Sequence, residues 1–197
     1  VQMDGPATTV VDAYLERAAA KYQASLQTDG GPLPEQDSNR WGSREAEIVD
    51  VEFLDASGER RPLFRTGERF IARIWYRAKQ PIPRAVIGVA IHRNDGAHVC
   101  GPNTRTQQAE IEVLDGEGFI DFITDELPLL DGIYEFTAAI YDHEMVHPYD
   151  HHERRFSFHV WRGDVAQRYG LINFPCRFDL EGMGAGRPQR SPAAVGK

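Results

Sequence analysis

Residues 132–161 read GIYEFTAAIYDHEMVHPYDHHERRFSFHVW, and this stretch decides the fold. Apolar side chains occupy every second position of 133–141 and again of 154–161. Because successive side chains of a strand point to opposite faces, each alternation predicts a strand with one buried face. Two such strands in succession predict neighbours in a half-buried antiparallel sheet. The residues between them predict a long loop, dense in His, Asp and Tyr.

Further alternating stretches precede this pair. Asn94-Asp95-Gly96 and Asp115-Gly116-Glu117-Gly118 predict hairpin turns among them. Short strands separated by turns, with no helix between them, favour a β-sandwich. The predicted strands that complete it cover residues 45–54, 70–78, 85–93, 98–103, 110–114 and 118–124.

The ends of the chain have a different character. Residues 9–26 place apolar side chains at helical spacing and predict a helix, and 27–40 are a Gly/Pro/polar linker. Leu171-Ile172-Asn173-Phe174 is apolar enough for a terminal strand. The sequence therefore divides into a linker helix and flexible linker over 1–40, a β-sandwich over 41–163, a terminal strand over 164–181 and a flexible tail over 182–197.

Composition excludes several classes of function. The net charge of −8 argues against nucleic acid as the main partner, because phosphate binding needs a basic face. Cys100 and Cys176 form neither a zinc pattern nor a disulfide framework. No run of about 20 apolar residues is present to span a membrane.

An ordered set of short motifs over about residues 41–162 resembles a known family. The chain is similar to the C-terminal carbohydrate-binding domain of the ATP-binding subunit of O-antigen (Wzt-type) polysaccharide ABC exporters. The motifs that carry the resemblance are Trp41-Gly42-Ser43, Phe64-Arg65-Thr66-Gly67-Glu68, Ile87-Gly88-Val89-Ala90-Ile91, Gly101-Pro102-Asn103-Thr104, Leu127-Pro128-Leu129-Leu130-Asp131-Gly132-Ile133-Tyr134 and Tyr149-Asp150-His151-His152.

The resemblance implies an immunoglobulin-like antiparallel β-sandwich that recognises the O-polysaccharide before export. It implies a homodimer, with a C-terminal strand that can exchange between protomers. It also implies that residues 1–40 follow a nucleotide-binding domain, the ATPase of the full subunit, which contacts a membrane-embedded permease at the cytoplasmic face of the bacterial inner membrane. This chain lacks the G-x-x-x-x-G-K-[ST] loop of such an ATPase.

An immunoglobulin-like order would put strands 85–93, 133–141 and 154–161 in one sheet. Its outward face would then show small residues surrounded by His and aromatic side chains, which predicts a shallow glycan groove. The alternative is a solvated sheet face with incidental aromatic residues. The candidate carbohydrate-binding residues are Tyr141, His92, His159, Trp161 and Thr137.

A second candidate surface lies on the predicted strand 70–78. Arg73, Trp75 and Arg77 share its outward face, which could hold an anionic glycan cap through charge-assisted hydrogen bonds. Trp and Arg are equally typical of dimer or domain contacts, and that interpretation is favoured.

The His-rich loop raises a metal hypothesis, since His and carboxylate side chains suit zinc. Its spacing matches no compact motif, and neighbours such as His151 and His152 point to opposite faces of an extended chain. We expect Tyr149-Asp150-His151-His152 to brace the loop by hydrogen bonds instead. We therefore assign no metal, cofactor or catalytic residue.

Two alternatives to glycan binding stay open at this point. One is a metal-dependent enzyme on a β-sandwich, centred on His147, His151 and His152. The other is a pure dimerisation module whose outward 133–161 face is covered by the partner.

Overall fold

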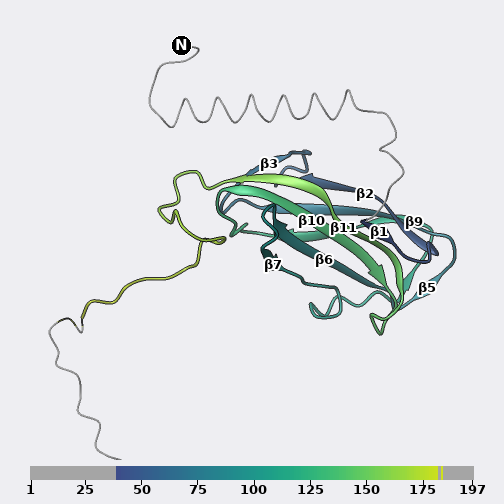
Figure 1. Cartoon of the computed structure of the whole chain (residues 1–197). Coiled ribbons are helices and arrows are strands. Elements are labelled where there is room, and N and C mark those ends of the chain that lie inside the picture. Colours follow the sequence, from purple (N-terminus) through teal and green to yellow (C-terminus); the bar gives the residue numbers. More distant parts are fainter. Residues whose placement is uncertain (1–38, 182, 184–197) are drawn as a thin grey trace, which may run out of the picture.

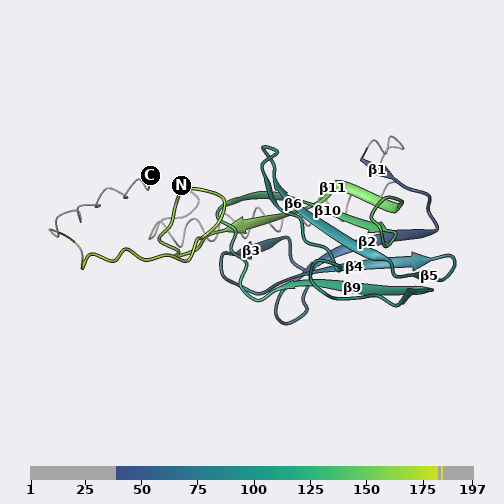
Figure 2. The ribbon, with the colours of Figure 1, turned by 90° about the horizontal axis from the view of Figure 1, so that it is seen from below.

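The alternating stretches of the sequence form two facing layers of strands. The computed structural model describes residues 39–181 and Met183, so the predicted helix over 9–26, most of the linker and most of the tail lie outside the described residues. Figures 1 and 2 show the two layers from orthogonal directions. Among the described residues, no helix is long and apolar enough to cross a membrane.

The larger layer is a six-stranded sheet with the path β1-β11-β10-β6-β7, in which β3 pairs with β11 in parallel and the other pairs are antiparallel. Its strands are β1 (Arg40–Trp41), β11 (Pro148–Trp161), β10 (Gly132–Tyr141), β6 (Val86–Arg93), β7 (His98–Cys100) and β3 (Leu63–Arg65). The predicted strands 85–93, 133–141 and 154–161 therefore do share one sheet.

The second layer is a three-stranded antiparallel sheet in the order β2-β4-β9. Its strands are β2 (Ala46–Leu54), β4 (Phe70–Ala78) and β9 (Glu117–Thr124), and a two-stranded pair joins β5 (Ile82–Pro83) to β8 (Val113–Leu114). The all-β sandwich predicted from the alternation is confirmed.

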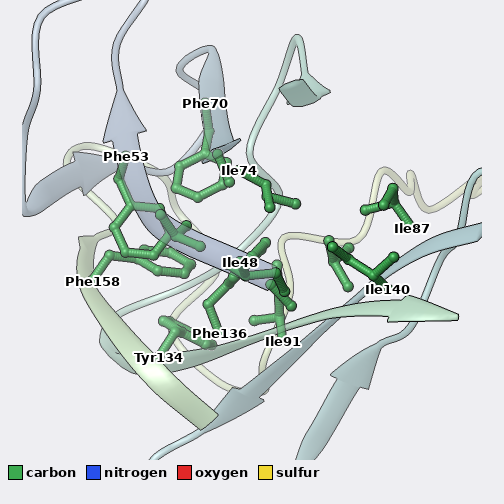
Figure 3. Packing of buried hydrophobic residues seen from close by; sticks show 14 of the residues in the cluster. Ile48, Phe53, Phe70, Ile74, Ile87, Ile91, Tyr134, Phe136, Ile140 and Phe158 are labelled. Atoms are coloured by element: carbon green, nitrogen blue, oxygen red, sulfur yellow. The ribbon is translucent and has the colours of Figure 1, made fainter. Parts of the chain in front are cut away.

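Aromatic rings fill the space between the layers. Phe158 of β11 lies 4.7 Å from Phe70 and 5.0 Å from Phe53, measured between ring centroids, and so bridges the two sheets. Figure 3 shows these rings together, with Ile74, Ile87 and Ile140 continuing the core away from them. Burial of such side chains is the main source of stability for a sandwich of this size.

The prediction of a long loop between the strands at 133–141 and 154–161 is wrong. β11 begins at Pro148, so only 142–147 connects it to β10. Asp150 and His152 lie on the core side of β11, opposite Ile140 and Ala138. Because these two core positions are polar, the start of β11 lacks the apolar alternation by which a strand is predicted. A bulge follows, because two steps of β10 from Phe136 to Ala138 match four steps of β11.

Asp150 is completely buried, and four groups surround its carboxylate. Its carboxylate accepts hydrogen bonds from Arg40 at 3.0 and 2.7 Å, from the Ile48 amide at 2.7 Å and from His152 Nε2 at 3.1 Å. Arg44 lies 3.3 Å away. Arg40 lies on β1, in the same sheet as β11, whereas Ile48 lies on β2 of the other sheet. This carboxylate therefore links the two sheets.

The same region leaves no room for a side chain at Gly42. Gly42 has φ of 135°, and a Cβ atom there would lie 2.4 Å from the Tyr149 carbonyl oxygen. Only glycine tolerates both conditions, so the chain between β1 and β2 passes directly against β11.

The predicted terminal strand over 164–181 pairs with residues 128–130 of the sandwich over a short stretch. The Leu130 amide donates to the Leu171 carbonyl at 2.9 Å, and the Asn173 amide donates to the Pro128 carbonyl at 2.6 Å. Leu129 and Ile172 form an isolated antiparallel bridge. Exchange of this segment between protomers stays a prediction.

Asp150→Asn is expected to lower the free energy of unfolding by about 3 kcal/mol, because it leaves Arg40 and Arg44 without their buried counterion. Asp125→Asn, which removes an exposed partner of Arg69, is the matched control and should leave the denaturation midpoint nearly unchanged. Urea denaturation of the three proteins measures this, and equal midpoints for both variants would contradict the role of Asp150.

The difference in unfolding free energy between wild type and Asp150→Asn should depend on pH. Burial alone would raise the pKa of Asp150, but the bonds from His152, Arg40 and the Ile48 amide outweigh it and hold the pKa far below its usual range. A carboxylate with a depressed pKa stabilises the fold at pH values above the pKa of the unfolded state, about 3.9. This stabilisation is lost progressively as the pH falls below that value. The gap between wild type and Asp150→Asn should therefore narrow below about pH 4.

Candidate functional site

Small side chains lie in the middle of the outward face of the six-stranded sheet. The pairing register places Trp41, His151, Ala139 and Gly88 side by side on β1, β11, β10 and β6, and Asn103 forms a bridge with Gly88. Among the described residues, only the Asn103 Cβ atom, 3.8 Å away, lies within 4 Å of the position of a Cβ atom on Gly88. Ala139 is only 4% exposed and Gly88 is half-buried, so the surface lies low over these two residues, between bulkier neighbours.

Three rings stand together at one side of this stretch, and we call Trp41, Tyr141 and His151 the aromatic cluster. The Trp41 and His151 rings stack at 4.0 Å with an angle of 13° between their planes. The Tyr141 hydroxyl lies 2.9 Å from His151 Nδ1, and the two rings are nearly perpendicular. Trp41 is 40% exposed, so part of its ring is open to a ligand.

Burial sets the protonation states within the aromatic cluster. It lowers the pKa of His151 and raises the pKa of Tyr141. At neutral pH, His151 is therefore uncharged and Tyr141 keeps its proton, so the Tyr141 hydroxyl can donate to Nδ1. The outcome is a rigid and uncharged surface of rings.

Comparison with known proteins identifies the family. The family model described as the Wzt C-terminal domain matches residues 37–174. The chain belongs to the Wzt C-terminal domain family. A crystal structure of the C-terminal domain of Wzt matches with a TM-score of 0.64 and 21% sequence identity, covering 77% of this chain and 92% of that one. This structural match independently supports the fold.

Two further solved structures align at lower similarity. A β-glucuronidase of Parabacteroides merdae aligns with a TM-score of 0.35 at 10% identity, over 59% of this chain and 13% of that enzyme. A CARDB domain from Pyrococcus furiosus aligns with a TM-score of 0.33 at 12% identity, over 61% and 92% of the two chains. No curated protein matches the sequence. Family membership gives this Wzt C-terminal domain a role in a polysaccharide ABC exporter, as a non-catalytic binding domain.

The structure does not gather the five predicted carbohydrate-binding residues at one point. Tyr141 belongs to the aromatic cluster. His159 is opposite Ile133, at the other end of β10, and is therefore roughly 25 Å from Tyr141 at about 3.4 Å per residue. Trp161 lies farther along β11, where Arg65 covers its ring at 4.9 Å.

His92 and Thr137 lie between these two ends. Thr137 is only 5% exposed, and its hydroxyl accepts a hydrogen bond from the Arg154 amide at 2.8 Å, so it supports the bulge of β11. His92 is opposite Glu135, and its ring lies 4.7 Å from that of His98. Burial, followed by the nearby His98 and Arg154, lowers the pKa of His92.

The histidines of the enzyme hypothesis point to separate places. His147 Nε2 contacts Ser43 and Glu45 at 3.1 and 3.2 Å, His151 belongs to the aromatic cluster, and His152 faces the core beside Asp150. Within residues 39–181 and Met183, no three His, Cys, Asp or Glu side chains are grouped so that they could hold a metal ion. Asp150 and His152 form hydrogen bonds within strand β11, whereas the sequence prediction placed this motif in a loop.

The outward face of β4 is already paired with carboxylates. Arg73 donates twice to Asp121 at 2.8 Å, and Arg77 donates to Glu117 at 2.6 Å. The Trp75 indole donates to Glu52 at 2.8 Å. Because the cations have partners within their own sheet, this face offers little to an anionic cap.

Sequence reasoning did not include Trp41 and His151 among the candidate carbohydrate-binding residues. Trp41 lies on a strand of two residues, which is too short to show alternation, and it meets His151 only through long-range pairing. His151 looked like a loop residue because the start of β11 was misplaced. Its position one residue after Asp150 was the available signal, since strand geometry then puts it on the outward face.

Trp41→Ala is expected to raise the pKa of His151 toward about 6.5, because burial is the main cause of its depression and Trp41 covers the ring. NMR titration of the His151 ring measures the change. Phe119→Ala, on the opposite sheet, is the control and should leave it where it is. An unchanged His151 pKa in Trp41→Ala would show that the stack does not shield the ring.

Proposed function

We propose that this Wzt C-terminal domain binds the polysaccharide of its exporter on the outward face of the six-stranded sheet. The observation that carries the proposal is the aromatic cluster beside the low stretch of Ala139 and Gly88. Sugar rings present C–H faces that pack on aromatic rings, and their hydroxyl groups bond to neighbouring polar side chains. A preformed sheet face suits an extended glycan chain, because little of the protein must be ordered on binding.

The finer parts of the proposal follow from the family. The bound glycan is an O-antigen polysaccharide, recognised at its terminus or along its repeat. Binding occurs on the cytoplasmic side of the inner membrane and delivers the glycan to the permease. The domain acts as a homodimer within a subunit whose ATPase provides the energy for export. Membership in the exporter family supports these statements.

The binding proposal is tested with the purified domain and the source organism's own O-polysaccharide, beside unrelated polysaccharides. Titration calorimetry should show saturable and selective binding. Absence of binding to every polysaccharide would overturn the proposal and favour a dimerisation module.

Trp41→Ala should weaken this binding about tenfold or more, because exposed tryptophans at binding surfaces dominate affinity. Trp75→Ala removes a tryptophan from the opposite sheet and is the matched control. Equal affinities for the two variants would remove the aromatic cluster from the site.

Gly88→Leu should block binding without unfolding the domain. The position has no positive φ, and within the described part of the chain a Cβ atom there meets only Asn103, at an ordinary contact distance of 3.8 Å. The added side chain would fill the low stretch of the face. A variant with the wild-type melting temperature and wild-type affinity would show that the glycan lies elsewhere.

A further inference from the structure

A small pocket lies beside the aromatic cluster, where β6 begins and β10 ends. It has a volume of about 270 Å³, and the residues that matter for its chemistry are Arg84, Val86, Arg105, Glu110, Glu112 and His143. Val86 pairs with Tyr141 across the sheet, so the pocket and the aromatic cluster share one edge. A ligand bound on the cluster can therefore extend into it.

Two arginines converge on one histidine in this pocket. The Arg84 Nη2 atom lies 2.7 Å from His143 Nε2, and Arg105 Nη1 donates to the His143 carbonyl at 2.8 Å. Because a guanidinium only donates, His143 Nε2 accepts the bond from Arg84. The histidine orients the arginines without neutralising them.

Within the described part of the chain, neither Arg84 nor Arg105 forms an ion pair. Most other arginines on the sandwich do, including Arg69, Arg73 and Arg77. In a chain of net charge −8, two unpaired guanidinium groups in one concavity are an exception. Their remaining N–H groups need an acceptor, and the fork of a guanidinium matches the two oxygens of a carboxylate.

The other walls of the pocket limit the charge of the ligand. Glu110 and Glu112 line the same space, and they disfavour a group of high negative charge. Ala85, Val86 and Ile111 add an apolar surface. We propose that this pocket binds a singly charged oxyanion, the carboxylate of an acidic sugar. That this sugar belongs to the glycan held by the aromatic cluster rests on the proposed function.

The anion site is tested first with sodium glucuronate as the probe, followed by the NMR signals of the arginine side chains and His143. Saturable shifts of Arg84, Arg105 and His143 are expected with glucuronate and not with glucose. High salt should weaken them, since it screens an exposed ion pair. No saturable shift with glucuronate would overturn the proposal. Tighter binding of inorganic phosphate than of glucuronate would overturn the choice of a carboxylate.

Arg84→Gln combined with Arg105→Gln should weaken glucuronate binding about tenfold or more, because each change removes a charged donor. Arg69→Gln combined with Arg77→Gln removes the same charge from arginines that already have carboxylate partners, and it should have no effect. Equal losses in the two double variants would reduce the effect to net charge and overturn the site.

Polysaccharide binding separates this inference from the proposed function. If the O-polysaccharide binds and glucuronate does not, the proposal of an oxyanion site is overturned and the proposed function stands. If glucuronate binds at Arg84 and Arg105 while no polysaccharide binds, the proposed function fails and the anion site stands. If both hold, conversion of the polysaccharide carboxylates to alcohols should weaken binding to the wild type and not to Arg84→Gln/Arg105→Gln. Equal weakening in both would place the carboxylate elsewhere.

Discussion

The buried carboxylate of Asp150 is the constraint on which the candidate site depends. A charge in that position is tolerable only with good partners, and Arg40, Arg44, His152 and the Ile48 amide supply them. Arg40 is drawn onto β11 by this bond, and the next residue, Trp41, is thereby placed over His151. Backbone hydrogen bonds from Ser43 to Pro148, from Arg44 to Tyr149 and from Glu153 to Asn39 hold the same segment against β11. The position of the aromatic cluster thus depends on these bonds together with the ion pair on the opposite side of the same strand.

The two faces of the molecule differ in how their polar groups are satisfied. On the β4 face, arginines and carboxylates neutralise one another across neighbouring strands. On the face of β10, small side chains separate an exposed tryptophan from polar groups, and the two unpaired arginines lie at its edge. Binding energy is available where charged groups have no ion-pair partner within the protein. This contrast favours the six-stranded sheet as the recognition face, with ring stacking and an anion pocket at the same end.

The sequence was informative wherever a strand has a simple alternation. The central strands and the sandwich followed from the apolar period of two, and parity placed Tyr141 on the outward face. The shared sheet followed from the immunoglobulin-like strand order that the family resemblance implies. The start of β11 was missed because Asp150 and His152 put polar side chains on the core face, which a hydrophobic pattern cannot distinguish from a loop. Their role depends on partners such as Arg40, which are distant in sequence.

The composition of the site was harder to predict than the fold for a related reason. Parity assigns a face but not a position along it, so His159 and Trp161 were grouped with Tyr141 although they lie near the other end of the sheet. Trp41 and the pair Arg84 and Arg105 meet their neighbours only through strand pairing or loop geometry. Nothing local in the sequence marks them.

The most direct test of the account is a map of the polysaccharide footprint on the isotopically labelled domain, read from NMR shifts of backbone amides and the Trp41 indole. The account predicts shifts at Trp41, His151, Ala139 and Gly88, with the outward face of β4 unaffected. Shifts confined to the β4 face around Arg73 and Trp75, or no shifts at a polysaccharide concentration that saturates binding, would contradict it.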